Sequence, residues 1–263
     1  FNDVLFRPKR STLSSRKEVD MEREFTFKYS ERKWKGVPII SSNMDTVSSV
    51  SMFKKLSKHK ILTCFHKFID IKEIITAVKE GSDPQYMMLS TGITEPDYDK
   101  LLLNVTLLHN EDIDLQFICI DVANGYMFKL VDFCKRIRTL FPKITLIAGS
   151  VVSREITEEL IINGKIDIVR VGIGSGAVCT TRLQTGVGIP QLSANIECSD
   201  AAHGLGGCII SDGGICHPGD VSKAYGAGAD FVMIGSMFSG HTETPGDVIE
   251  ENGKQFKLYY GMS

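Results

Sequence analysis

A cysteine flanked by glycines and hydroxyl side chains is the residue of this sequence best suited to covalent chemistry. Cys179 lies in the segment VGIGSGAVCTTR, residues 171–182, and is followed by Thr180, Thr181 and Arg182. A thiolate on a flexible loop can act as a nucleophile, whereas a buried thiol is inert, and spacing alone supports both interpretations. No histidine stands close by in the sequence as a general base, so Thr181 and Arg182 are the polar groups available.

Glycine-rich segments mark the half of the chain in which a ligand would bind. Of 24 glycines, 15 fall between Gly172 and Gly240, and SDGG (211–214) and IGSM (234–237) each end an apolar run. Such loops let backbone N–H groups approach a phosphate, whereas tight turns alone explain single glycines. Asp212 could accept hydrogen bonds from a ribose or serve only as a capping carboxylate. Successive carbonyls in GIGSG could coordinate a monovalent cation.

Alternating apolar runs and helix-like segments predict the elements that hold these loops. Each apolar run is continuous, as in strands buried on both faces. The predicted strands are residues 37–43, 61–65, 86–90, 116–121, 144–149, 167–172, 207–212 and 230–235. The predicted helices are residues 48–58, 70–80, 97–109, 126–140, 153–163, 190–203 and 218–227.

Eight strands with seven helices between them predict an α/β fold, a (β/α)8 TIM barrel without its eighth helix. The glycine-rich loops then follow the last three strands, at the barrel end where active sites form. A doubly wound open sheet is the alternative, but no GxGxxG follows the first strand.

The two ends of the chain extend this single predicted domain, residues 1–263. Residues 1–36 are charged and aperiodic, which predicts an arm or short hairpin over one barrel end. Residues 247–260 predict a hairpin with Asn252-Gly253 at its turn. Because an uncovered eighth strand would expose apolar surface, we expect the native chain to continue beyond residue 263. The continuation would hold a flap with a carboxylate and then a covering helix.

Composition restricts the class of protein. Thirty basic and 32 acidic residues give a net charge of −2, so no global field attracts nucleic acid. No run of 18 apolar residues predicts a membrane span. Seven cysteines without a CxxC pair argue against a disulfide framework or structural zinc and fit a reducing cytosol. We therefore expect a cytoplasmic protein without nucleic-acid or membrane partners.

Three motifs together resemble the IMP dehydrogenase/GMP reductase family: VGIGSGAVCTTR, SDGG and PIISSNMDTV. The resemblance covers essentially the whole chain. The run TTR after the cysteine, IDVANGY (120–126) and the opening FNDVLFRPKRSTLSSR favour its reductase branch. HKFID also leads directly into a helix, with no room for the regulatory domain pair of most dehydrogenases. GSM (235–237) replaces the usual GGM, but Ser236 keeps its backbone N–H.

The resemblance implies reductive deamination of GMP to IMP and ammonia with NADPH, in purine nucleotide salvage. Cys179 would form a thioimidate at purine C2, and Thr181 would relay a proton from the carboxylate of the later segment. The implied GMP contacts are Asp212, Gly213, Gly214, Gly235, Ser236 and the main chain of Gly261, Met262 and Ser263.

The resemblance also implies cofactor and ion sites in a homo-oligomer, expected to be a tetramer. The implied NADPH contacts are Ser15 and Arg16 of a neighbouring subunit, Lys67, Asp121, Val122, Ala123, Ile173, Gly174 and Met262. The implied potassium site comprises carbonyls of Gly174, Gly176 and Cys179, with Arg182 beside them.

Three alternatives remain open at this point. An IMP dehydrogenase without its regulatory insert would run the same covalent chemistry toward oxidation, with water in place of ammonia. A non-catalytic purine-nucleotide-binding subunit would not need the thiol. A flavin-binding barrel would give a coloured preparation.

Overall fold

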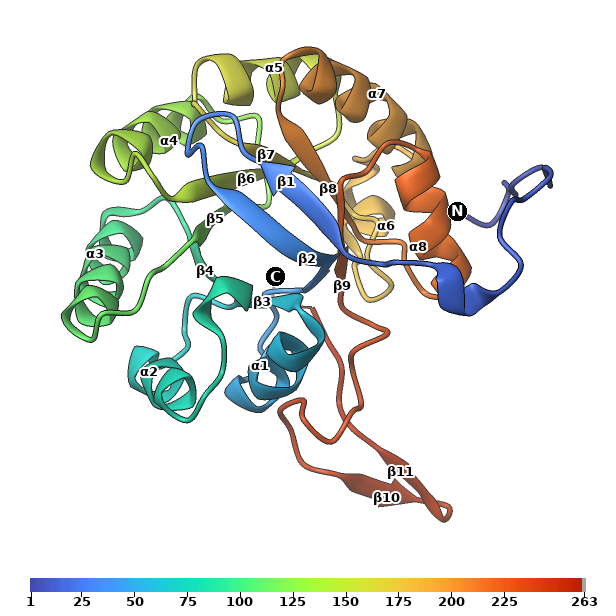
Figure 1. The fold of residues 1–263 in the computed structure, drawn as a ribbon, viewed down its shortest axis with the longest axis horizontal. Helices are drawn as coiled ribbons and strands as arrows, with labels where there is room; N and C mark the ends of the chain where they lie inside the picture. Colours follow the sequence, from blue (N-terminus) through green and yellow to red (C-terminus); the bar gives the residue numbers. More distant parts are fainter. Residues whose placement is uncertain (262–263) are drawn as a thin grey trace.

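The computed structural model describes residues 1–261, whose backbone forms a closed parallel barrel (Figure 1). Within these residues each barrel strand pairs in parallel with the next, and β2 pairs with β9 to close the ring. The barrel strands are β2 (Lys33–Ser41), β3 (Ile61–Phe65), β4 (Met87–Thr91), β5 (Phe117–Asp121), β6 (Thr145–Val151), β7 (Ile168–Val171), β8 (Cys208–Asp212) and β9 (Phe231–Ile234). The TIM-barrel prediction is therefore confirmed, and closure excludes the open sheet.

Helices surround the barrel between successive strands (Figure 1). They are α1 (Val50–Leu56), α2 (Ile71–Lys79), α3 (Glu95–Asn110), α4 (Phe128–Leu140), α5 (Arg154–Ile162), α6 (Thr181–Thr185), α7 (Gln191–Gly204) and α8 (Pro218–Gly226). All but α6 were predicted. No helix follows β9 within residues 1–261, as the count of predicted elements required.

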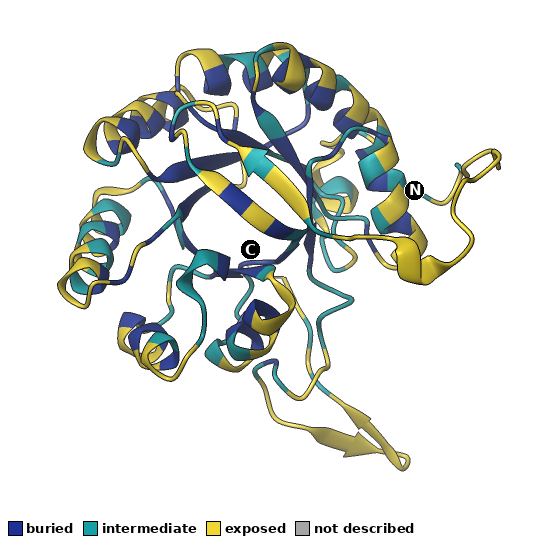
Figure 2. Ribbon diagram, in the orientation of Figure 1, coloured by how far each residue is buried: buried dark blue, intermediate teal, exposed yellow. Residues whose placement is uncertain are grey.

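The apolar faces of the helices account for their packing. In α2, Ile71, Ile74 and Ile75 repeat at helical spacing and are buried, while the Asp70 carboxylate caps the first turn by accepting from Lys72 N. Every residue of β6 is buried, because this strand has the barrel core on one face and helices on the other. Figure 2 shows the buried strands inside a ring of half-exposed helices.

A β-hairpin forms the last part of the segment predicted as an arm. Strand β1 (Arg23–Thr26) pairs antiparallel with the start of β2, with Phe25 opposite Trp34. The first barrel strand therefore begins at Lys33 rather than at residue 37. Exposed Lys33 and Lys35 alternate with buried neighbours there, so this part of the strand lacks the continuous apolar run used for prediction.

Aromatic side chains from this hairpin close the amino-terminal end of the barrel. Phe27 and Trp34 are each 2% exposed and contact the fully buried rings of Phe117 and Phe231. Phe27 meets Phe117 edge to face at 5.7 Å, and the Trp34 indole donates to the Gln85 carbonyl at 3.1 Å. This end of the barrel is consequently filled by side chains.

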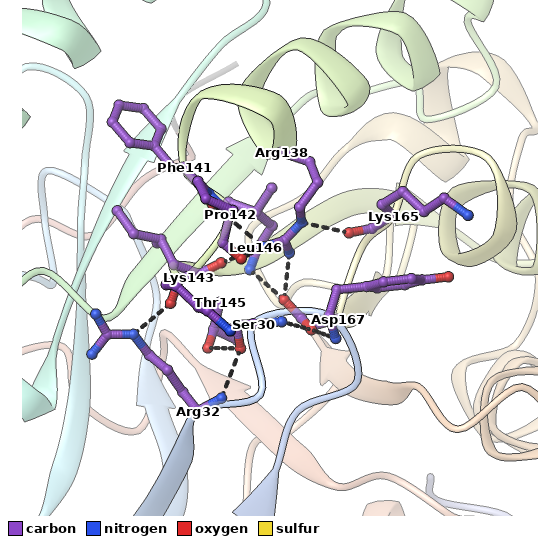
Figure 3. A network of polar contacts seen from close by, with 12 residues as sticks. Ser30, Arg32, Arg138, Phe141, Pro142, Lys143, Thr145, Leu146, Lys165 and Asp167 are labelled. Atoms are coloured by element: carbon purple, nitrogen blue, oxygen red, sulfur yellow. Dashed lines mark hydrogen bonds and ion pairs between the residues drawn. The ribbon is translucent and has the colours of Figure 1, made fainter.

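A buried ion pair fastens the hairpin to the barrel (Figure 3). The Asp167 carboxylate, just before β7, is completely buried and accepts from Tyr29 N, Ser30 N and Leu146 N at 2.7, 3.2 and 3.0 Å. Arg138 Nη2 donates to the same carboxylate at 2.6 Å. One charged residue therefore links the hairpin, β6, β7 and α4.

A second hairpin follows β9 and projects from the barrel (Figure 1). Strands β10 (Ile249–Glu251) and β11 (Lys254–Phe256) pair antiparallel. Asn252 and Gly253 form the turn with φ values of 54° and 71°. Both residues therefore have the left-handed backbone that a two-residue hairpin turn requires.

Candidate active site

The carboxyl ends of the barrel strands surround a cavity of about 720 Å³. Its lining comes from the ends of all eight barrel strands and the segments that follow them, together with Tyr259 and Gly261. The volume and the mixture of glycine backbone, carboxylates and hydroxyls suit a small organic ligand with polar groups.

Cys179 lies in the lining on the loop between β7 and α6 and is half-buried. Its backbone N–H donates to the Gly176 carbonyl at 3.0 Å, so the loop turns back on itself at the thiol. The thiol donates to Thr181 Oγ1 across 3.3 Å, where Thr181 begins α6. The hydroxyl therefore lies within hydrogen-bond reach of the thiol without rearrangement of the backbone.

Arg182 lies behind the lining and supports the Cys179 loop. Its Nε donates to the Ile173 carbonyl at 3.1 Å, and its Nη2 donates to the Ile189 carbonyl at 2.5 Å. Gly174 has φ +67°, and a Cβ there would lie 2.6 Å from Arg182 Cγ. The loop is thus packed directly on the arginine stem, which explains why this position is glycine.

The loop carbonyls suit the predicted cation in their chemistry. Those of Gly174, Gly176 and Cys179 are neutral oxygen ligands of the kind that bind a hard monovalent ion. Gly176 O already accepts from Cys179 N, which orients that carbonyl. In the same part of the chain, residues 1–261, no cluster of His, Cys, Asp and Glu is arranged to hold a metal ion.

The loops after β7, β8 and β9 pack closely against one another through glycine backbone and side-chain oxygens. A Cβ on Gly213 would lie 2.3 Å from Ser175 Oγ, and one on Gly235 would lie 2.8 Å from the Tyr259 hydroxyl. Ser236 Oγ donates to a carbonyl of the loop after β8 at 3.2 Å. The result is a tightly held glycine backbone at the cavity wall, which suits an anionic phosphate group.

A buried arginine joins two carboxylates at the floor of the cavity. Arg170 Nη1 lies 2.5 Å from Asp121 Oδ1, and its Nη2 lies 2.8 Å from Asp212 Oδ2. Asn43 Nδ2 donates to the other oxygen of Asp121 at 2.6 Å. Burial lowers the pKa of Arg170, but Asp121 and Asp212 raise it more, so it lies well above its ordinary value. The guanidinium therefore remains charged.

Lys67 follows β3, across the barrel from the β7 loop that carries Cys179. Its Nζ forms an ion pair with Asp97 Oδ1 at 2.9 Å. Burial raises the pKa of Asp97, but hydrogen bonds from Thr94 and Lys67 lower it more, so it lies below its ordinary value. Phe68 extends its ring from the same segment and is 65% exposed, with Lys67 Nζ 5.4 Å from its centroid. The side offers a cation and an exposed aromatic face to a ligand.

The structure brings most of the residues predicted for the site to this one cavity. Its lining includes Cys179, Thr181, Asp212, Gly213, Gly214, Gly235, Ser236, Gly261, Lys67, Asp121, Val122, Ala123, Ile173, Gly174 and Gly176. Ser15 and Arg16 do not line it; Ser15 caps the short helix of residues 16–18 in the amino-terminal segment. Met262 and Ser263 lie outside the described residues.

Among the polar lining residues that sequence reasoning missed are Arg170 and Asn43, which contact the predicted carboxylates. A signal for Arg170 existed, because it is the charged residue inside the apolar run DIVRVG. A charge in a strand buried on both faces requires a partner. Asn43 carries no comparable signal, since asparagine is ordinary in a loop.

The sequence model of the IMP dehydrogenase / GMP reductase domain matches residues 1–263. The GMP reductase of Klebsiella pneumoniae subsp. pneumoniae is 54% identical over 265 residues, which is 100% of this chain and 75% of the relative. GMP reductases of Salmonella paratyphi B and Escherichia coli O139:H28 match with the same identity and coverage. None of the helices in residues 1–261 is long and apolar enough to cross a membrane.

Proposed function

Because the chain belongs to the IMP dehydrogenase/GMP reductase family, it is an oxidoreductase, and we propose that it converts GMP to IMP and ammonia with NADPH. The observation that carries the proposal is the Cys179–Thr181 pair, 3.3 Å apart at the wall of a nucleotide-sized cavity. The relatives named as GMP reductases support the same reaction.

In this proposal the glycine loops hold the nucleotide. The phosphate lies on the backbone of Gly213, Gly214, Gly235 and Ser236, and the ribose hydroxyls donate to Asp212. The base then reaches Cys179, with the main chain of Gly261 at its edge. Binding energy from the phosphate, which does not react, positions the purine C2 against the sulfur.

Cys179 begins the reaction as a nucleophile. Purine C2 is electron-poor because it lies between two ring nitrogens and carries the amine. The thiolate pair forms an S–C2 bond while the C2–N3 π pair moves to N3. When that pair returns, the C2–amine bond breaks and ammonia leaves with one added proton. The product on the enzyme is a thioimidate, so one difficult substitution becomes two easier steps.

Thr181 moves the proton that ammonia requires. A hydroxyl gives up its own proton too reluctantly to act as the acid alone, but it can accept one proton while donating another. Its oxygen already accepts from the Cys179 thiol. In this proposal Thr181 relays a proton to the departing amine, and the carboxylate expected on the later segment supplies that proton.

The opposite side of the cavity holds the cofactor in this proposal. When bound, NADPH supplies the hydride that replaces sulfur at C2. Lys67, with its positive charge, and the segment Asp121, Val122 and Ala123 bind it, and the turn at Ile173 and Gly174 limits its approach to Cys179. Phe68 offers an exposed ring for a flat heterocycle.

The proposal further includes a potassium ion on the Cys179 loop carbonyls and a cytoplasmic homotetramer. In that assembly Ser15 and Arg16 reach the site of a neighbouring subunit. Analytical ultracentrifugation tests the assembly, and activity in potassium against lithium buffers tests the ion.

One assay separates the proposed reaction from the oxidation that an IMP dehydrogenase would catalyse. We expect NADPH absorbance to fall when GMP is added and to remain constant without it, with one ammonia formed for each NADPH consumed. A mixture of IMP and NAD should give no reduced cofactor. Production of NADH from that mixture, with no loss of NADPH on GMP, would identify a dehydrogenase and refute the proposal.

A further inference from the structure

Arg170 occupies a position that none of the proposed binding roles explains. It projects from β7 at the cavity floor, and its side chain is only 11% exposed. Its two carboxylate partners are more open, with Asp121 32% and Asp212 20% exposed. The carboxylates therefore face the cavity while the guanidinium joins them from below.

The two carboxylates belong to different halves of the proposed site. Asp212 ends β8 on the side of the nucleotide loops, and Asp121 ends β5 on the cofactor side. Besides the Nη2 contact, Arg170 Nε donates to Asp212 at 2.9 Å, so the Asp212 contact is bidentate at the arginine. A planar guanidinium can make these contacts at once, whereas a lysine ammonium is a single point charge.

The backbone around Arg170 leaves it little freedom to move. A Cβ on Gly149 of the neighbouring strand would lie 2.3 Å from the Arg170 carbonyl oxygen. On the other side, Arg170 is in register with Ile210 of β8. A displacement of either carboxylate must therefore be taken up by the guanidinium and the other carboxylate rather than by the strand.

The same connection extends to the nucleophile loop. Ser175 Oγ donates to the backbone carbonyl of Asp212 at 2.8 Å, and a Cβ on Gly172 would lie 2.0 Å from that oxygen. The loop that carries Cys179 therefore contacts Asp212, whose carboxylate pairs with Arg170. If Asp212 becomes less mobile, we expect the Cys179 loop to become less mobile as well.

We infer that Arg170 is a positioning residue that couples nucleotide binding at Asp212 to cofactor binding at Asp121. This inference rests on the proposed function, which assigns the two ligands to those carboxylates. A nucleotide that covers Asp212 excludes water and strengthens the pull of Arg170 on both carboxylates. Asp121 is then already ordered when the cofactor arrives, so the two ligands tighten each other's binding.

Binding experiments on the Cys179→Ala enzyme test this coupling without turnover. NADPH is titrated by its fluorescence with and without saturating GMP, and GMP is titrated by calorimetry with and without NADPH. We expect each ligand to tighten the other by at least about fivefold, by the same factor in both orders. Adding Arg170→Lys should reduce that factor to below about twofold, while each ligand alone still binds.

The chain offers a matched control in Arg138, another buried arginine paired with an aspartate, at the far end of the barrel. Arg138→Lys should leave the coupling factor unchanged. Full coupling in Arg170→Lys, or loss of coupling in both variants, overturns the inference. If the parent binds both ligands without coupling, only the inference fails; if it binds neither, the proposed function fails as well.

A second measurement does not depend on how well Arg170→Lys folds. Asp121→Asn and Asp212→Asn, alone and combined, form a double-mutant cycle on the affinity for NADPH in the presence of GMP. Coupling through Arg170 predicts that the double variant differs by more than about threefold from the product of the single effects. Simple multiplication of the two effects contradicts it.

Discussion

At the residue scale, the reactivity proposed for Cys179 depends on groups held by the same short stretch of backbone. The Gly176 carbonyl fixes the turn, the Thr181 hydroxyl accepts a hydrogen bond from the thiol, and Arg182 supports the loop from behind. The proposed nucleophile and the proposed proton carrier thus lie within two residues of each other. Their separate contributions can be tested by single substitutions.

Cys179→Ala should abolish turnover while leaving GMP affinity nearly unchanged. The thiol forms the bond, whereas the glycine loops supply most of the ground-state binding. We expect NADPH oxidation to fall at least about a thousandfold, with GMP binding measured by calorimetry. Residual turnover within about tenfold of the parent, roughly 1.4 kcal/mol in barrier, contradicts the nucleophile assignment.

Thr181→Ala should slow ammonia release more than hydride transfer, because only the first step needs a proton at the amine. The expected loss in that step is about a hundredfold or more. Single-turnover measurements of the two half-reactions make the comparison. Thr181→Ser keeps the hydroxyl and serves as the control, and equal slowing of both half-reactions would refute the relay.

At the scale of elements, the barrel was predictable because its strands are buried on both faces. Continuous apolar runs located every barrel strand, and helical spacing located seven outer helices. The start of β2 was misplaced because Lys33 and Lys35 face outward there. The short α6 was missed because its sequence TRLQT is too brief to show a helical period.

The candidate site was predictable where it needs a particular residue type, such as glycine or cysteine. It was not predictable where it depends on contacts between side chains that are distant in the sequence. Glycine loops and a cysteine between them are visible in the sequence. The pairing of Arg170 with Asp121 and Asp212 is not, because it joins three strands far apart in the chain. The ion pair between Lys67 and Asp97 likewise leaves no pattern in the sequence that would predict it.

Gly213→Ala should weaken GMP binding by at least about tenfold, or roughly 1.4 kcal/mol. A methyl group there would lie 2.3 Å from Ser175 Oγ and would push the β7 and β8 loops apart. Gly246→Ala is the matched control. The φ of Gly246, +95°, is close to the +89° of Gly213, but a Cβ at Gly246 would have no neighbouring atom within 4 Å. Equal effects of the two substitutions on GMP affinity would show that backbone strain, not the clash, is responsible.

Asp220→Asn should destabilise the protein at neutral pH by about 1 kcal/mol through the cap of α8. Burial raises the pKa of Asp220, but hydrogen bonds from Cys216 N and His217 N and the charge of Lys223 lower it more. A lowered folded-state pKa means stability that is present above about pH 4 and lost as pH falls through the folded value. Urea unfolding from pH 7 to pH 3 should therefore show a difference that shrinks with acid; a constant difference contradicts this role.

At the scale of the whole molecule, the two ends of the barrel have different tasks. The carboxyl ends of the strands surround the cavity, whereas the amino-terminal end is closed by the aromatic rings and by Asp167. Polar atoms at the closed end are engaged with one another rather than with a ligand (Figure 3). Substitutions at that end should lower the free energy of unfolding while leaving the turnover of the folded protein unchanged.

Asp167→Asn should lower the free energy of unfolding by about 3 kcal/mol, because it leaves the buried Arg138 charge without its counterion. Turnover per folded molecule should remain that of the parent. Denaturant unfolding followed by circular dichroism measures the first quantity. Asp114→Asn breaks a pair whose carboxylate is 59% exposed and should cost less than about 1 kcal/mol. Comparable losses of unfolding free energy in the two variants would contradict the role of Asp167 as the buried counterion of Arg138.

The closed end of the barrel also bears on how this chain could be redesigned. New substrate loops usually reduce stability, and a protein tolerates them only while it remains above the threshold for folding. Since Trp34 and the aromatic rings that it contacts do not line the cavity, their packing can be improved first without changing a lining residue. A library of loop variants aimed at other ligands would then start from a more stable parent, which tolerates more destabilising substitutions.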